Sequence, residues 1–306
     1  MIYEAIMNRS IQYLALIFAG LALVQCQSNH RADLPAAELE SLARNFNGDV
    51  GMFVMDLETG ATYELNADTL FPTASTIKIP ILIGMFDTFE KGDLSYRQTV
   101  NYSSDHDYSW ANDIISQLKP GAEVEISKLI HLMMSTSNNT ASLWNQHLAG
   151  TGSAINALMD SLGYEHTRVN SRTDGRDQDW EVYGWGQTTP RELARMMLEI
   201  YRGDIISPVA SEQMYRIMTR NYWDGEALSE IPPYVQVASK NGAVSRSKSE
   251  VLLVNAPSGD YLFSVITKNQ QDEGYEDDNE GFQLLRDVSE LLYSHFEPED
   301  DWVPIR

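Results

Sequence analysis

The sequence predicts an α+β fold in which an antiparallel β-sheet is flanked by helices and interrupted by an all-α subdomain. Two segments toward the ends of the chain, 49–68 and 247–268, are rich in β-forming residues and are punctuated by glycine. Residues 120–235 lie between them and have the apolar spacing of helices. The simplest arrangement places both β segments in one sheet. The expected parts are an α/β part (40–95 and 236–306) and a helical part (96–235).

The elements before the helical part follow from local signals. Residues 49–68 predict two strands joined by a turn at 58–60. Residues 75–91 predict a buried helix that is stopped by the glycine that follows them. Pro80 lies beyond the first turn of this helix, so a local kink is expected there.

The middle and the end of the chain add helices and a second pair of strands. Residues 189–203 contain a complete helix start, with Thr189 as N-cap, Pro190 at the first helical position and Glu192 closing a capping box. Residues 247–268 predict two strands joined by a Pro-Ser-Gly turn. Further helices are expected at 126–134, 140–149, 153–163 and 281–296.

Composition is that of a globular protein and excludes some partners. Hydrophobic residues make up 43% and charged residues 22% of the 306 residues. The formal net charge of −22 argues against nucleic acid as a partner and against adhesion to anionic lipid, because both need a basic face. The acidic run at 272–280 matches no calcium-loop spacing and is interpreted as a solvated loop.

The N-terminal stretch is expected to be an export signal. Residues 11–24 are an apolar run that is too short to cross a bilayer comfortably, and Arg9 precedes them. A start at Met7 gives the cleaner signal, so residues 1–25 are interpreted as a signal peptide whose true start is Met7. Cys26 is the single cysteine, follows the apolar run and resembles the lipidated residue of a bacterial lipoprotein. The alternative is an ordinary secreted protein with a leftover thiol.

Ser75 and Lys78 are the main candidates for chemistry. The Ser-x-x-Lys pattern occurs three times, but only this pair opens a long apolar helix. At i and i+3 the two side chains lie on one helical face. A lysine on a buried face is costly unless its charge is relieved, and a neutral lysine is what a serine needs beside it to become a nucleophile. The alternative is a helix-start serine beside a lysine that reaches solvent. The other two pairs are Ser116/Lys119 and Ser245/Lys248.

Two further motifs follow along the chain. Ser-Asn-Asn at 137–139 falls between two predicted helices, and Lys-Asn-Gly at 240–242 falls on or just before a returning strand. Together with Ser75 and Lys78 they resemble the Ser-x-x-Lys, Ser-Asp-Asn and Lys-Thr-Gly motifs of class A β-lactamases and penicillin-binding serine hydrolases. The similarity runs from about residue 40 to the C-terminal helix and includes the Thr-Thr-Pro helix start. It implies a β-lactamase/transpeptidase-like fold.

The resemblance implies catalytic roles for four side chains and two backbone groups. Ser75 would be the acylated nucleophile and Lys78 its proton-transfer partner. Ser137 would pass a proton to the leaving nitrogen, and Lys240 would supply positive charge toward Ser137 and a substrate carboxylate. The backbone N–H groups of Ser75 and Ala243 would form the oxyanion hole.

The resemblance also implies substrate contacts. Asn139 would hydrogen-bond the substrate amide, and Gly242 would let its strand approach the ligand closely. Asn241 stands where the family has a hydroxyl residue, and its amide could still donate to a carboxylate. Asn138 replaces the usual aspartate, which should mainly affect how that loop is held. Tyr102 matches the aromatic wall beside the substrate, and a core tyrosine is an equal alternative.

The deacylation device of the family is not found in the sequence. Its β-lactamases carry Glu-x-x-Leu-Asn in a loop after the Ser-Asp-Asn motif, and the glutamate and asparagine hold the deacylating water. The corresponding stretch is 167–190, where counting places Thr173 at the position of the glutamate. Asp174 and Gln178 repeat the carboxylate-then-carboxamide spacing one residue later. Asp174 is therefore a candidate substitute base, with an ordinary surface aspartate as the alternative.

The predicted function is that of an exported active-site-serine hydrolase, comprising residues 26–306. β-Lactams would acylate Ser75, and the β-lactam amide would be hydrolysed with weak deacylation. One alternative is a penicillin-binding-protein-like peptidase or an esterase that uses the same serine. The non-enzymatic alternative is a lipoprotein that keeps the fold as a binding module.

No cofactor is expected, and the expected partners are small molecules. The six histidines form no HxH or HExxH arrangement, and no glycine-rich phosphate loop follows a strand. Metal and phosphate-binding cofactors are therefore not predicted. The expected ligand is a β-lactam or a peptide or ester, and the expected state is a monomer. We expect a location in the periplasm of a bacterium or on its membrane, the latter only through Cys26.

Overall fold

The computed structural model describes residues 33–104 and 113–304. The helices are α2 (Ala36–Asn45), α3 (Lys78–Glu90), α4 (Ile126–Ser135), α5 (Asn139–Leu148), α6 (Thr151–Ser161), α7 (Asp177–Tyr183), α8 (Pro190–Arg202), α9 (Pro208–Met218) and α10 (Glu280–Phe296), with 3₁₀ helices η1 (Ala74–Ile77) and η3 (Ala227–Glu230). The strands are β1 (Asp49–Asp56), β2 (Thr62–Leu65), β3 (Phe71–Pro72), β4 (Thr99–Asn101), β5 (Glu123–Glu125), β6 (Arg168–Val169), β7 (Gly186–Thr188), β8 (Gln236–Val244), β9 (Ser247–Asn255) and β10 (Tyr261–Lys268).

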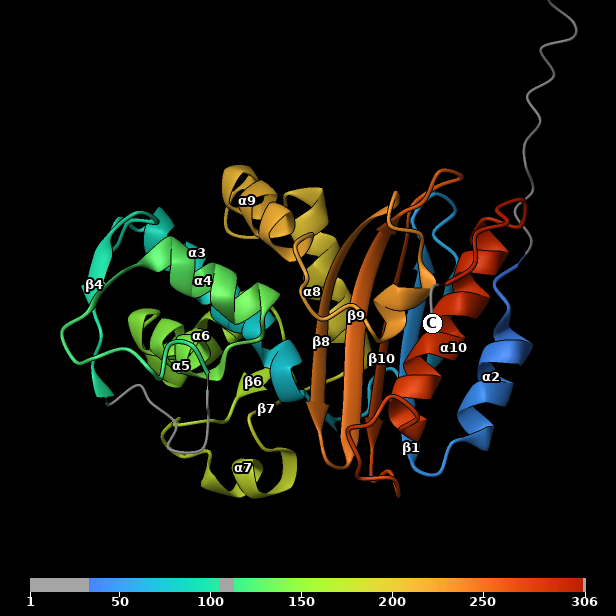
Figure 1. Cartoon of the computed structure of the whole chain (residues 1–306), viewed down its shortest axis with the longest axis horizontal. Coiled ribbons are helices and arrows are strands. Elements are labelled where there is room, and N and C mark those ends of the chain that lie inside the picture. The colour runs from blue at the N-terminus through green and yellow to red at the C-terminus, as the bar shows by residue number, and fades with distance from the viewer. Residues whose placement is uncertain (1–32, 105–112, 305–306) are drawn as a thin grey trace, which may run out of the picture. The chain divides into compact units, whose positions relative to one another are not determined.

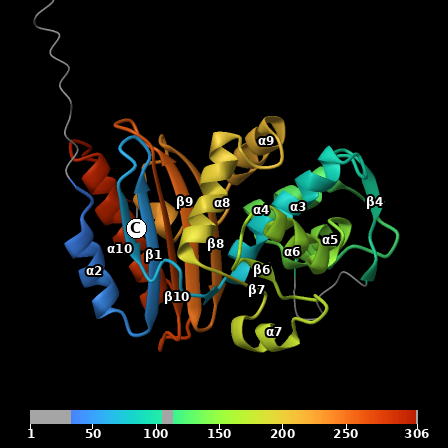
Figure 2. The same cartoon turned by 180° about the vertical axis from the view of Figure 1, so that it is seen from behind.

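The main sheet joins segments from both ends of the chain. Its strand order is β2-β1-β10-β9-β8, and each neighbouring pair is antiparallel. Along β10, Leu262 and Ile266 face one hydrophobic cluster, whereas Tyr261, Phe263 and Val265 face another. A sheet that is apolar on both faces needs cover on both. Helices α2 and α10 lie on one face and α8 on the other (Figures 1 and 2), which confirms the predicted sheet flanked by helices.

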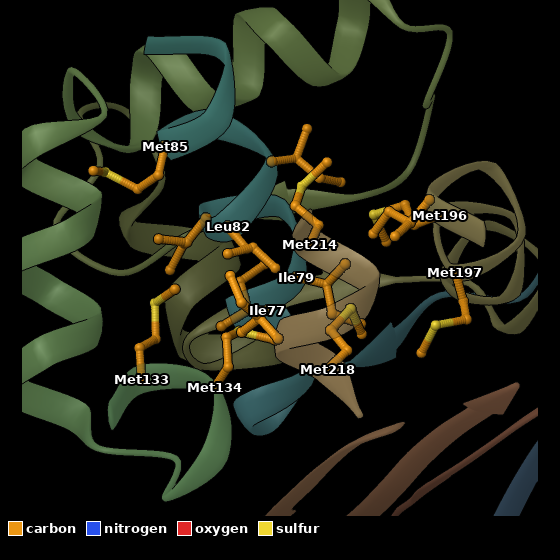
Figure 3. Packing of buried hydrophobic residues seen from close by; sticks show 14 of the residues in the cluster. Ile77, Ile79, Leu82, Met85, Met133, Met134, Met196, Met197, Met214 and Met218 are labelled. Carbon is orange, nitrogen blue, oxygen red and sulfur yellow. The ribbon is translucent and has the colours of Figure 1, made fainter. Parts of the chain in front are cut away.

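The remaining large helices pack around a methionine-rich core. Helix α3 is buried from Lys78 to Phe86 and contacts α4, α5, α6 and α9. Figure 3 shows methionine side chains of α3, α4, α8 and α9 gathered around Ile79 and Leu82. The flexible, unbranched methionine side chain fills the irregular gaps between helices that run in different directions. Helix α8 belongs by sequence to the expected helical part, yet it packs against β1, β9 and β10.

The segment predicted as one helix at 75–91 is divided in two. A 3₁₀ turn covers Ala74–Ile77, and the α-helix begins only at Lys78. Pro80 therefore falls in the first turn of α3, where its missing N–H has no helical partner to lose. The irregularity expected near Pro80 lies at the change from 3₁₀ to α-helix.

The start of α8 differs from the predicted capping box. Thr189 is the N-cap and accepts from Glu192 N at 3.2 Å, as predicted. The Glu192 carboxylate instead accepts from the backbone N–H groups of residues 165–167 and from the Thr167 hydroxyl. The carboxylate thereby holds the beginning of the 167–190 loop, because several buried donors converge on it.

The predicted signal peptide 1–25, the start at Met7 and the lipidated Cys26 lie outside the described residues. Between residues 33 and 104 and between 113 and 304, no helix has both the length and the apolar character needed to span a bilayer.

Candidate active site

Ser75 and Lys78 lie where the 3₁₀ turn passes into α3. The turn η1 packs against β8 and β9 at one edge of the sheet, and α3 continues into the helical part (Figure 1). Ala74 has a φ of 45°, a left-handed conformation that costs a non-glycine residue about 1–2 kcal/mol. Ser75 lines a cavity, whereas Lys78 is fully buried. The strained turn thus separates an accessible hydroxyl from a buried amine that remain in contact.

Lys78 is surrounded by oxygen atoms. Its Nζ lies 2.9 Å from Ser75 Oγ, 2.9 Å from Ser137 Oγ and 2.9 Å from Asn139 Oδ1. It also lies 2.6 Å from the backbone oxygen of Ser137. The structure therefore brings the Ser-x-x-Lys pair and the Ser-Asn-Asn segment together around one nitrogen atom.

The surroundings of Lys78 favour its neutral form. The pKa of Lys78 lies well below its usual value, because burial penalises the ammonium and the charge of Lys240 repels it, although Asp113 opposes both effects. A neutral lysine has two N–H donors and one lone pair. The backbone oxygen of Ser137 and Oδ1 of Asn139 can only accept, so they take the two N–H groups. The lone pair is left for the hydroxyl of Ser75 or Ser137.

The Ser-Asn-Asn segment is held by the start of α5. Ser137 has a left-handed φ of 55°, and Asn138 is the N-cap, whose side chain accepts from Ala141 N at 2.7 Å. Asp113 brings a carboxylate to the same helix start and accepts from the backbone N–H and the hydroxyl of Thr140. Negative charge is favourable at a helix N-terminus. Because Asp113 already supplies that charge, a neutral cap is sufficient at Asn138.

The edge strand β8 comes very close to Ser75. A Cβ placed on Gly242 would lie 2.7 Å from Ser75 N and 2.8 Å from Thr73 O, so a side chain cannot fit there without displacing backbone. Ser249 on β9 ties the same two segments together, since its hydroxyl lies 3.1 Å from Thr73 O and 3.3 Å from Gly242 O. Ala243, the next residue of β8, lines the same cavity as Ser75.

Lys240 and Asn241 are linked to each other. Lys240 is fully buried, and its Nζ lies 2.8 Å from both the backbone oxygen and Oδ1 of Asn241. The Asn241 amide group donates to Glu226 Oε2 at 2.5 Å. Burial lowers the pKa of Lys240 to about 8, against the attraction of Glu226 and Glu250. Lys240 therefore acts on Lys78 through its charge, while its hydrogen bonds stay with its neighbour.

A cavity of about 520 Å³ opens in front of Ser75. Of the predicted site residues, the cavity contains Ser75, Ser137, Asn139, Asn241, Gly242 and Ala243. It also contains six aromatic or charged residues that no motif indicated. These are Trp223, Glu226, Tyr275, Asp277, Phe282 and Arg286. They come from the segment before η3 and from around the start of α10, where isolated residues give no recognisable pattern.

Three further residues considered from the sequence do not line this cavity. They are Tyr102, Asp174 and Thr173, the last of which stands at the family's glutamate position. Tyr102 is buried, and its ring meets that of Trp144 edge-on with centroids 5.7 Å apart, as in the core alternative. Asp174 is exposed and is not among the residues that line the cavity. Thr173 is buried, and its hydroxyl donates to Ser171 O at 3.0 Å.

Comparison with known proteins agrees with this geometry. The model of the Beta-lactamase enzyme family matches residues 34–296. The chain belongs to the β-lactamase enzyme family. Its similarity to individual members of that family is low. It is 18% identical to β-lactamase VEB-1 of Pseudomonas aeruginosa over 94% of this chain and 98% of that protein. It is 26% identical to β-lactamase AER-1 of Aeromonas hydrophila over 68% of each chain.

Solved structures of the β-lactamase and penicillin-binding superfamily have the same fold. A mutant of PBP-A, solved as an acyl-enzyme complex with penicillin G, superposes with a TM-score of 0.75 at 26% sequence identity. The match covers 86% of this chain and 95% of that one. This β-lactamase-family chain is therefore a class A-like serine hydrolase by family and fold.

Proposed function

We propose that this protein is an exported serine hydrolase in which a β-lactam, or a related amide or ester, acylates Ser75. The observation that supports the proposal best is the position of Lys78 Nζ, 2.9 Å from the hydroxyls of both Ser75 and Ser137. A buried lysine with a lowered pKa beside a serine is the arrangement that activates a hydroxyl without a histidine.

Acylation would use groups that are already in contact. Ser75 Oγ attacks the carbonyl carbon while its proton passes to the lone pair of Lys78. The backbone N–H groups of Ser75 and Ala243 stabilise the oxyanion, a contribution that typically amounts to about 10²–10³ in rate per donor. The carbon–nitrogen bond then breaks as Ser137 gives its proton to the leaving nitrogen, and Lys78 returns a proton to Ser137. Asn139 holds the substrate amide and orients Lys78 through Oδ1.

Release of the acyl group would be slow. Deacylation needs a base within hydrogen-bond reach of a water at the ester. Thr173 has no carboxylate and donates to Ser171 O, and Asp174 is exposed and is not among the residues that line the cavity, so we expect neither to activate a water at Ser75. The likeness to PBP-A, a mutant of which was solved as a penicillin G acyl-enzyme, favours a long-lived adduct as well.

A pulse of benzylpenicillin followed by intact-protein mass spectrometry tests the proposal. We expect one adduct per chain within seconds, a slow return to the free mass, and no adduct in Ser75→Ala. A lasting adduct with no measurable release would favour the peptidase-like alternative. Rapid release would favour an efficient β-lactamase. Equal masses with and without the drug in the wild type would refute acylation and favour the binding module.

We also propose export with Cys26 as a lipid anchor, because the residue follows an apolar run that resembles a lipoprotein signal. Cys26→Ser should then move the protein from the membrane fraction to a soluble or unprocessed form. Unchanged membrane fractionation of this variant, with the wild type as reference, would count against the anchor.

A further inference from the structure

One end of the active-site cavity contains a carboxylate where the resemblance led us to expect a docking place for a substrate carboxylate. Glu226 lines the cavity, and its Oε2 accepts from the Asn241 amide at 2.5 Å. Glu250 lies directly opposite Asn241 in the β8–β9 register, is fully buried, and accepts from Ala227 N at 2.8 Å. Two carboxyl groups therefore flank Asn241.

The donors expected to receive a substrate carboxylate are already used by the protein. Lys240 directs its Nζ to the two oxygens of Asn241. Asn241 in turn donates to Glu226. Arg286, the cation that lines the cavity, donates to the backbone oxygens of Gly225 and Asp277. An arriving carboxylate would thus meet Glu226 beside donors that already have hydrogen-bond partners within the protein.

Like charges repel strongly in a partly desolvated cavity. Glu226 is near Lys240 on β8, Lys248 and Glu250 on β9, and Arg286 on α10. The pKa of Glu226 is raised, mainly by burial, against the hydrogen bond from Asn241 and the attraction of Lys240, Arg286 and Lys248. A second anion beside Glu226 would add repulsion to this cost of burial. A carboxylate can however accept from a neutral N–H group, and the Asn241 amide shows that Glu226 Oε2 does so.

We propose that the Glu226–Asn241 end of the cavity takes an uncharged hydrogen-bond donor, such as a primary amide, in place of a carboxylate, and that Glu226 determines this preference. The inference rests on the proposed acylation of Ser75. It names the substrate class: amides or esters whose neighbouring group carries no negative charge.

The test compares benzylpenicillin with its primary amide, which differ only at the carboxyl group. The measured quantity is the ratio of their second-order acylation rates, followed by intact-protein mass spectrometry. We expect the wild type to react about tenfold or more faster with the amide. Glu226→Gln keeps the size of the side chain and should reduce this ratio about tenfold. The matched control is Asp224→Asn, which removes an exposed carboxylate two residues away and should leave the ratio within about twofold.

The pH dependence of the ratio provides a second test. Lowering the pH protonates Glu226, so the preference of the wild type for the amide should become smaller toward acid pH. The preference of Glu226→Gln, in which Glu250 and Asp277 remain, should change less. Effects of pH on Lys78 act on both substrates and cancel in the ratio. A wild type that prefers the carboxylate, or a ratio that Glu226→Gln leaves unchanged, overturns the inference while the acylation of Ser75 stands. Absence of any Ser75 adduct with both compounds overturns the proposed function, and the inference with it.

Discussion

Lys78 and Lys240 are two fully buried lysines in one active site, and burial lowers the pKa of both. The consequences for chemistry differ. In the proposed mechanism Lys78 must be neutral to accept the proton of Ser75, whereas Lys240 contributes through its charge. The charge of Lys240 makes Lys78 easier to deprotonate, because two ammonium groups would repel each other. The proposed acylation therefore requires Lys78 to lose its proton at a lower pH than Lys240.

The acylation rate should consequently pass through a maximum with pH. It rises as Lys78 deprotonates, well below the usual lysine pKa, and falls above about pH 8 as Lys240 loses its charge. In Lys240→Arg the guanidinium keeps its charge, so the falling limb should move to more alkaline pH even if the maximal rate is lower. The control is Lys119→Arg, at the exposed lysine of another Ser-x-x-Lys pair. An unchanged falling limb in Lys240→Arg would show that another group controls it.

A variant of Asp174 tests whether this residue is the base that releases the acyl group. Because its carboxylate is exposed and lies away from the cavity lining, Asp174→Asn should change neither the acylation rate nor the slow release by more than about twofold. The measurement is the decay of the benzylpenicillin adduct in variant and wild type. A markedly slower decay with normal acylation would identify Asp174 as the base and would require the 167–190 loop to move toward Ser75.

Elements with a clear hydrophobic period were predictable from the sequence. Contacts between polar side chains that are distant in the sequence were not. The strands at 49–68 and 247–268 and the helix at 281–296 appear in the structure within a few residues of their predicted limits. Nothing local indicated that Asp113 would reach the start of α5, or that Glu226 and Glu250 would flank Asn241. Such contacts depend on how elements pack, and a single acidic residue in an ordinary segment has no pattern to detect. Glu192 is a third example, since its position suggested the backbone N–H of Thr189 as partner, whereas its actual donors lie at residues 165–167.

Glu192 allows a prediction at the scale of an element. Its buried carboxylate accepts from three successive backbone N–H groups and one hydroxyl at residues 165–167. Glu192→Gln puts an amide N–H₂ group against those donors and removes the negative charge at the start of α8. We expect a loss of roughly 3 kcal/mol in the free energy of unfolding, measured by urea denaturation. Glu165→Gln, which alters a solvent-exposed side chain of the same loop, should cost less than about 0.5 kcal/mol.

At the scale of the whole molecule, the sheet and the active site depend on the same long-range pairing. Strand β1 pairs with β10 from Asp49 to Asp56, and η1, which bears Ser75, packs on β8 and β9. The proposed nucleophile, near the N-terminal part of the chain, is thus positioned by strands from its C-terminal part. The order of the motifs along the sequence indicated that the Ser75 segment and the C-terminal strands lie together. The distances around Lys78 could come only from the folded chain.

The charge of the molecule leads to a last prediction. With 44 acidic and 22 basic residues the net charge is −22, and residues 273–278 of the acidic run are exposed. Mutual repulsion of this excess should destabilise the compact state, and salt screens it over about 10 Å at 0.1 M. We expect the free energy of unfolding in urea, an uncharged denaturant, to rise by roughly 1–2 kcal/mol between 0.02 and 0.5 M sodium chloride. The double variant Glu276→Gln/Asp278→Asn removes two exposed charges from the run, so it should be more stable than the wild type at low salt and gain less from added salt. Stability that falls with salt in both proteins would mean that the surface ion pairs, such as Arg191 with Glu64 and Asp68, outweigh the repulsion.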